Sequence, residues 1–208
     1  QALDWGLRSI LLLGIPAGIA LSLFSMPLIA GCFAYGQFHV NDVLQTQKSL
    51  MTLGLGVPAF MMVKVLASGF YARQDISTPV KVGIWSMVIN TLLCALFIGF
   101  FAHAGLTLAS ALAGYVNCGG LLVLLIRRGI FKPSPGWFKF GMQLLAGNLA
   151  LTLYLYYAMG TVDYWLGLSA VLRLSMLLSH VAIVVIIYVL VLGLSGLRFK
   201  HFRGQVKE

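Results

Sequence analysis

Six long runs of apolar residues are the feature that most constrains the fold of this chain. They cover approximately residues 8–35, 47–72, 80–102, 105–126, 138–160 and 170–194. A helix needs about 20 apolar residues to cross a hydrocarbon core about 30 Å thick. In water, a chain of 208 residues could not bury a composition that is 60% hydrophobic and only 9% charged. The sequence therefore predicts an all-α protein, a polytopic membrane bundle of six transmembrane helices.

The basic residues predict how this bundle is oriented. Thirteen of the 14 Lys and Arg lie outside the centres of the apolar runs. Those on one predicted side are Arg8, Arg73, Lys81, Arg127, Arg128, Lys132, Lys139, Arg198, Lys200, Arg203 and Lys207. Only Lys48 and Arg173 fall on the other side. Because cytoplasmic loops carry the excess of Lys and Arg, we expect both chain ends to face the cytoplasm. This clustering indicates that the net charge of +9 interacts with the phospholipid bilayer. It does not favour nucleic-acid binding, which needs a basic stripe on a folded domain.

A polar stretch, "GFYARQDISTPVK" at 69–81, separates the second and third runs. We expect a cytoplasmic turn there, in which Ser77 or Thr78 caps the next helix and Pro79 lies in its first turn. The residues of this loop motif are Arg73, Asp75, Thr78, Pro79 and Lys81. The same analysis predicts an outer loop at 36–48, an outer connection "HAGLT" at 103–107 and a basic cytoplasmic loop at 127–137.

Lys64 is the strongest candidate for a functional residue within the membrane. It lies nine residues before Arg73, or ~13.5 Å along an ideal helix, which places it near the middle of the bilayer. A central lysine costs about 2.5–3.5 kcal/mol on insertion scales. Two interpretations stay open: a hydrated bundle interior solvates it, or it lines a cavity for an anionic substrate. Asn90 and Asn117 are weaker substrate-binding candidates, because buried asparagines more often bridge helices.

Glycine and proline residues mark two of the helices as hinged. Gly14, Pro16 and Gly18 lie in the first run, and Pro58 bends the second run six residues before Lys64. Such breaks are typical of transporters that rock between states. They also occur in static bundles, where neighbouring helices satisfy the freed carbonyl groups.

The chemistry of catalysis is missing from the sequence. The five acidic residues, Asp4, Asp42, Asp75, Asp163 and Glu208, all lie near run ends, in loops or in the tail. His180 lacks a carboxylate one turn away, and we expect it to have a packing role. No motif for phosphate binding, zinc binding or a serine nucleophile is present, and the three cysteines share no metal-binding spacing. We therefore expect no catalytic residues, no metal, no cofactor and no enzyme activity.

Several motifs resemble one family of transporters. They are "KVLASGFYARQDISTPVK" at 64–81, "YGQF" at 35–38, "HAGL" at 103–106 and "PSPGW" at 133–137. They resemble the MurJ/MviN-type lipid II flippases of the multidrug/oligosaccharidyl-lipid/polysaccharide exporter superfamily. The resemblance implies fourteen helices in the bacterial inner membrane, of which this chain would be the last six. The chain would then be a carboxyl-terminal portion whose partner includes the missing amino-terminal helices.

The resemblance also implies a division of the chain and a function. Residues 1–126 would be four helices of the second lobe, 127–137 a basic loop, 138–194 two terminal helices that form a lipid-tail groove, and 195–208 a basic tail. The whole protein would move a lipid-linked peptidoglycan precursor of the undecaprenyl-pyrophosphate type to the outer leaflet by alternating access. Some relatives bind sodium through Asn and Asp one turn apart, but here Cys94 follows Asn90, and a thiol suits a hard cation poorly. The alternatives are a related polysaccharide-lipid or drug exporter and a non-transporting scaffold of cell-wall synthesis.

Overall fold

The computed structural model describes residues 2–33 and 40–196, and within them it confirms an all-α fold without strands. The helices are α1 (Ala2–Leu23), α2 (Ser25–Phe33), α3 (Val40–Tyr71), α4 (Ser77–Phe101), α5 (His103–Arg127), α6 (Trp137–Ala158), α7 (Val162–Gly167) and α8 (Ala170–Leu194). The "YGQF" motif, residues 36–39 of the predicted outer loop and residues 197–208 of the basic tail lie outside these described residues.

The structure confirms a polytopic helix bundle. Five helices in the described part of the chain are long and apolar enough to cross a membrane: α1, α3, α4, α5 and α8. The remaining predicted span, 138–160, corresponds to the 22-residue helix α6. This helix is not among the five, because Gln143 and Asn148 interrupt its apolar sequence.

The first run is two helices that meet at Phe24, shortly before Pro27, which cannot donate a backbone hydrogen bond. Two predicted boundaries are wrong. Residues 40–48 of the predicted outer loop already belong to α3. The predicted connection "HAGLT" is the start of α5, because Ala102 alone reverses the chain with a φ of 49°.

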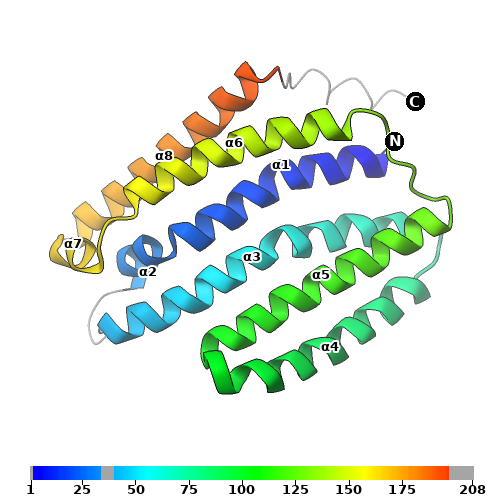
Figure 1. Cartoon of the computed structure of the whole chain (residues 1–208), viewed down its shortest axis with the longest axis horizontal. Coiled ribbons are helices and arrows are strands. Elements are labelled where there is room, and N and C mark those ends of the chain that lie inside the picture. Colours follow the sequence, from blue (N-terminus) through cyan, green and yellow to red (C-terminus); the bar gives the residue numbers. More distant parts are fainter. Residues whose placement is uncertain (1, 34–39, 197–208) are drawn as a thin grey trace.

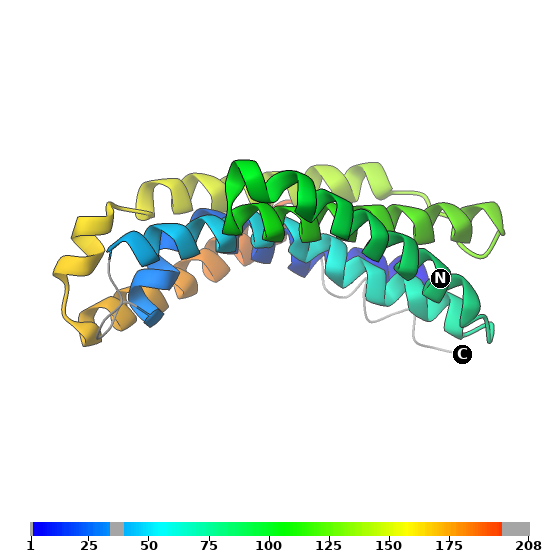
Figure 2. The same cartoon turned by 90° about the horizontal axis from the view of Figure 1, so that it is seen from below.

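Helices α4, α5, α3, α1 and α6 lie side by side in this order, and α8 crosses α6 on one side of the layer (Figure 1). Seen edge-on, this layer is an arch (Figure 2). A helix in a single layer buries only the two edges that touch its neighbours, so large apolar side chains remain exposed on both faces. Trp85 of α4, for example, is 69% exposed. Lipid or further protein must cover these faces.

One end of the layer collects the start of α1, the α3–α4 loop and the α5–α6 loop, at the right of Figure 1. The seven described cations predicted to be cytoplasmic lie in these segments or in the helix turns beside them. Lys48 and Arg173 belong to turns near the opposite end. The fold thus brings together the basic residues that the charge pattern assigned to one side of the membrane.

Candidate functional site

Lys64 lies on an exposed face of α3. The two edges of α3 are occupied, since Gly54 packs on α1 and Gly56 packs on α5. Lys64 points away from both edges, is exposed, and has no hydrogen bond or ion pair within the described residues. Its face of α3, which includes Phe60 one turn earlier and Ser68 one turn later, is called the Lys64 face below.

The other two predicted polar residues come to the same face of the layer. Helices α3 and α5 run parallel, and the ring of Phe60 lies over Gly114, where an added Cβ would be 2.6 Å from its Cε1 atom. One turn beyond that contact, helical periodicity places Asn117 beside Lys64. The Oδ1 atom of Asn117 is buried and finds no hydrogen-bond partner in the described part of the chain.

On the antiparallel helix α4, Asn90 faces the same way and its Oδ1 accepts a hydrogen bond of 3.4 Å from the Cys94 thiol. The opposite face of the layer carries Trp85 and, on α5, Leu112. Across residues 2–33 and 40–196, no three His, Cys, Asp or Glu side chains come close enough to hold a metal ion.

The predicted hinge residues of two helices meet at one point. A Cβ added at Gly18 would lie 2.6 Å from the carbonyl oxygen of Gly54 and 3.1 Å from Cδ of Pro58. One added at Gly14 would lie 3.5 Å from Cα of Pro58. Only glycine permits this approach of the α1 and α3 backbones. Pro16 is buried on another side of α1, where it lines the groove described next.

An apolar groove of about 570 Å³ lies between α1, α6 and α8. Its lining is almost wholly hydrophobic: Leu12, Leu13, Pro16, Ala17, Ala20, Leu21, Phe24, Leu28, Leu151, Leu155, Val181, Val184, Val185, Tyr188, Val189 and Leu192. The predicted lipid-tail groove has only the two terminal helices as walls, whereas the groove seen here is also lined by α1 and by Leu28 of α2. On α1, Leu13 and Ala17 point to the side of the layer that carries Lys64, so the groove opens on the Lys64 face.

The loop motif forms a clamp between two loops. Asp75 Oδ1 accepts a 3.0 Å hydrogen bond from the Thr78 amide, and Oδ2 accepts one of 2.6 Å from the Thr78 hydroxyl. The Arg128 guanidinium lies 2.6 Å from the same Oδ2 atom. The hydrogen bonds from Thr78, followed by the bond and charge of Arg128, lower the pKa of Asp75 to about 2.

The predicted capping residue of α4 is therefore wrong. The side chain of Asp75, rather than that of Ser77 or Thr78, accepts the hydrogen bond from the free backbone amide of Thr78 at the start of α4. Pro79 is buried in the first turn of the helix. Arg73 and Lys81 are exposed beside the clamp.

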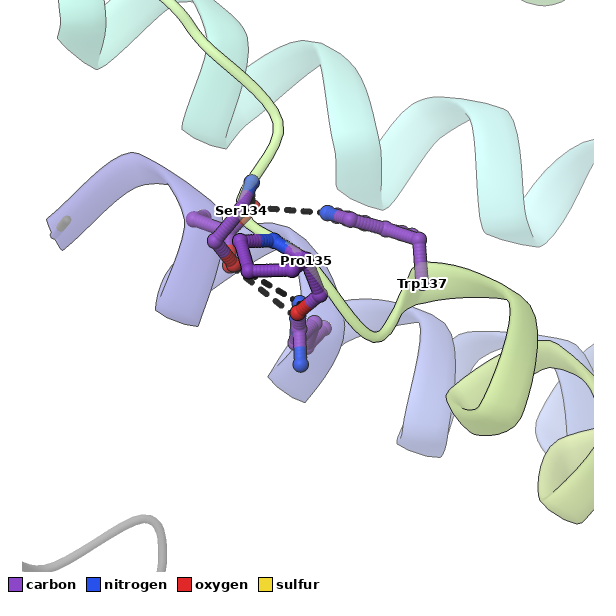
Figure 3. A network of polar contacts seen from close by, with 5 residues as sticks. Ser134, Pro135 and Trp137 are labelled. Atoms are coloured by element: carbon purple, nitrogen blue, oxygen red, sulfur yellow. Dashed lines mark hydrogen bonds and ion pairs between the residues drawn. The ribbon is translucent and has the colours of Figure 1, made fainter.

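A second polar cluster, which the sequence analysis missed, joins α1 to the α5–α6 loop. Asp4 Oδ2 accepts a 2.6 Å hydrogen bond from the Ser134 hydroxyl, and Oδ1 accepts one of 2.7 Å from the Trp137 indole. Arg8 forms a 3.0 Å ion pair with Asp4 and lies 5.1 Å from the Trp137 ring centre. Figure 3 shows Ser134, Pro135 and Trp137 turned toward the first turns of α1. We call Asp4, Arg8, Ser134 and Trp137 the Asp4 latch.

His180 has a polar partner that the sequence analysis did not identify. The Tyr154 hydroxyl and His180 Nδ1 are 2.7 Å apart, across α6 and α8. The rings of Phe24 and Trp165 pack edge-on and tilted against the imidazole, at 5.7 and 6.2 Å. This aromatic cluster joins the α1–α2 junction at Phe24 to α6, α7 and α8, at the end of the groove that Phe24 lines.

Comparison with known proteins gives a consistent result. Residues 1–186 match the family described as "Lipid II flippase MurJ". The chain is 36% identical over 207 residues to "Lipid II flippase MurJ" of Burkholderia cenocepacia, which covers 99% of this chain and 40% of that protein. It is 33% identical to "Probable lipid II flippase MurJ" of Vibrio cholerae, covering 100% of this chain and 39% of that protein. A protein of the same description in Haemophilus influenzae is 34% identical, with 97% and 39% covered. The chain thus spans about 40% of the length of these relatives.

Proposed function

This chain belongs to the lipid II flippase MurJ family, and from that premise we propose that it is the carboxyl-terminal part of a protein that moves lipid II across a membrane. Its relatives and apolar helices indicate a multi-pass protein of the bacterial inner membrane. The cargo would be an anionic lipid-linked peptidoglycan precursor of the undecaprenyl-pyrophosphate type, and the activity would be transport by alternating access, without catalysis. The observation that carries the proposal within the chain is the apolar groove that opens on the face bearing Lys64.

The groove suits the long apolar tail of such a cargo. Its walls offer hydrocarbon from four helices, α1, α2, α6 and α8, and almost no polar surface. Because bilayer lipid is as apolar as these walls, burial in the groove yields little free energy over burial in the membrane. The groove would therefore act by alignment: it would hold the tail in lipid while the head lies on the Lys64 face.

Lys64 suits the anionic head. An isolated charge in hydrocarbon costs many kcal/mol, so the pyrophosphate needs a hydrated and cationic route. Lys64 supplies an ammonium group that is exposed and unpaired within the described residues. Asn117 and Asn90 would add amide groups on the same face. The remaining helices of the protein would close the other side of this route.

The glycine and proline contact between α1 and α3 would be the pivot of the lobe. Close backbone contact leaves few side chains to be repacked when one helix tilts on the other, and Pro16 and Pro58 weaken the hydrogen-bond ladders of their helices. We further propose that the end of the layer with the Asp75 clamp faces the cytoplasm, because the excess of basic residues lies there.

The experiment that tests this function replaces the Lys64 charge in the complete protein. Cells depleted of their own flippase are supplied with Lys64→Met, Lys64→Arg or Lys48→Met variants, each checked for membrane insertion. We expect Lys64→Met to lose rescue and Lys64→Arg to retain part of it. Lys48→Met should rescue fully, because Lys48 lies at the other end of α3. Full rescue by Lys64→Met would favour the alternative of a non-transporting scaffold, which has no use for this charge.

A further inference from the structure

The terminal helices have a narrow attachment to the rest of the chain. In the described chain, the substantial contacts of α6 to α8 with the other helices are those with α1 and α2. Their covalent link is the α5–α6 loop. Much of the space between α1 and the α6–α8 pair is the open groove. Buried apolar side chains of α1 and α2 pack against α6 to α8, and the Tyr188 hydroxyl of α8 donates a 2.7 Å hydrogen bond to the Leu12 carbonyl oxygen of α1. At the first turns of α1, the polar contacts of the Asp4 latch hold the start of α6.

The Asp4 latch lies where that loop becomes α6. Gly136, with a φ of 97°, turns the chain so that Trp137 begins the helix with its indole directed back to α1. Asp4 is only 7% exposed, and its carboxylate receives three hydrogen bonds from Ser134 and Trp137 besides the ion pair with Arg8. Arg8 also donates a 2.8 Å hydrogen bond to the Ser134 hydroxyl. A buried carboxylate with this many charge-assisted bonds fixes its partners in one geometry.

The two sides of α1 are therefore built differently. Toward α3, the glycine contact places backbone against backbone. Toward α6 and α8, side-chain contacts prevail: the buried apolar cluster and the Tyr188–Leu12 hydrogen bond lie beside the groove along the middle of the helix, and the latch lies at its first turns. The Asp4 carboxylate lies about two helical turns before Leu12, where the lining of the groove on α1 begins.

We propose that Asp4 is a positioning residue that sets the width of the groove by fixing the start of α6 on α1. This inference rests on the proposed function in one respect only: the groove is taken to hold the tail of the transported lipid. Asp4 itself does not touch the cargo. Loss of the latch would let the α6–α8 pair shift on α1, so that the groove would hold an apolar chain less well.

A distance measurement across the groove tests the proposal without any cargo. Spin labels are attached at Leu13→Cys on α1 and Leu190→Cys on α8, which are 61% and 59% exposed. The complete protein is placed in lipid nanodiscs after the native cysteines, Cys32, Cys94 and Cys118, are changed to Ala. We expect one narrow distance distribution with the latch intact.

The variants then remove the latch in steps. Asp4→Ala should broaden the distribution and raise the ratio of displaced to docked populations roughly tenfold to a hundredfold, as expected for the loss of charge-assisted hydrogen bonds. Trp137→Phe keeps the ring beside Arg8 and removes only the indole donor, so a smaller change in the same direction is expected. Asp75→Ala breaks the other clamp at the same end, and it should leave the Leu13–Leu190 distance unchanged.

A transport assay gives the second readout. With fluorescent lipid II in proteoliposomes, Trp137→Phe should raise the half-saturating concentration and leave the maximal rate nearly unchanged. Unchanged distances in both Asp4→Ala and Trp137→Phe would overturn the proposal, whatever the protein transports. If Asp4→Ala fails to insert, Trp137→Phe alone decides. A protein that does not move lipid II would refute the proposed function, while the distances would still decide the role of Asp4.

Discussion

A methyl group at Gly18 should separate α1 from α3. The added Cβ would lie 2.6 Å from the Gly54 carbonyl oxygen and 3.1 Å from Cδ of Pro58. Neither atom belongs to a flexible side chain, so the two helices must move apart. Overpacking of this kind costs typically about 1–3 kcal/mol. Alanine stabilises a helix by about 1 kcal/mol relative to glycine. This gain offsets part of the stability that overpacking removes.

Gly119→Ala is the matched control for this substitution. Gly119 lies within α5, and a Cβ added there meets nothing within 4 Å. The gain in helix propensity is common to both variants and cancels in their difference. We therefore expect Gly18→Ala to be less stable than Gly119→Ala by about 1–3 kcal/mol.

The assay is unfolding of the complete protein in mixed micelles as the fraction of denaturing detergent rises, followed by circular dichroism. Gly18→Ala should unfold at a lower fraction than Gly119→Ala, and Gly54→Ala should resemble Gly18→Ala. Equal unfolding midpoints for Gly18→Ala and Gly119→Ala would show that the backbones do not meet at Gly18, and the proposed pivot would lose its basis.

Three further predictions concern the groove, the clamp and the orientation. Val185→Trp should fill the groove and reduce labelling by a photoreactive polyprenyl phosphate, whereas Val171→Trp, at the exposed start of α8, should not; equal labelling would contradict the assignment of the groove. Since the pKa of Asp75 lies near 2 in the folded chain, its hydrogen bonds should stabilise the start of α4 above about pH 4 and be lost between about pH 4 and pH 2. Hydrogen exchange of the Thr78 amide should show this loss, and in an Asp75→Asn variant it should not. A Lys132→Cys thiol should react with an impermeant reagent only from the cytoplasmic side of the membrane, and reaction from outside would reverse the orientation.

The sequence predicted the helices well because the length and composition of an apolar run are enough to identify a membrane span. Runs of apolar residues and their basic flanks were enough to place the segments of α3, α4, α5 and α8 and to group the loops at one end. Helix ends were less predictable. The first turns of α3, residues 40–48, are mostly polar, so hydropathy does not mark them as part of the helix. The chain reversal at Ala102 needs a backbone conformation that alanine rarely adopts.

Contacts between distant segments could not be predicted from the sequence. The Asp4 latch joins residues about 130 positions apart, and Asp4 looked like a solvated residue near the start of a span. Two signals could have pointed to it: Asp4 and Arg8 lie one turn apart at the start of an apolar helix, and the tryptophan of "PSPGW" needs an acceptor for its indole N–H if buried. The alignment of Lys64, Asn117 and Asn90 on one face depends on the order of helices in the layer, which no single helix encodes.

Photo-crosslinking from the two faces of the layer tests most directly whether lipid II lies on the Lys64 face. A benzophenone amino acid is placed at Phe60 or Ala17 on the Lys64 face, and at Leu112 or Trp85 on the opposite face, in the complete protein in cells that make lipid II. The account predicts crosslinks to lipid II from Phe60 and Ala17 and none from Leu112 and Trp85. Equal crosslinking from both faces, or crosslinking from Leu112 and Trp85 alone, would contradict it.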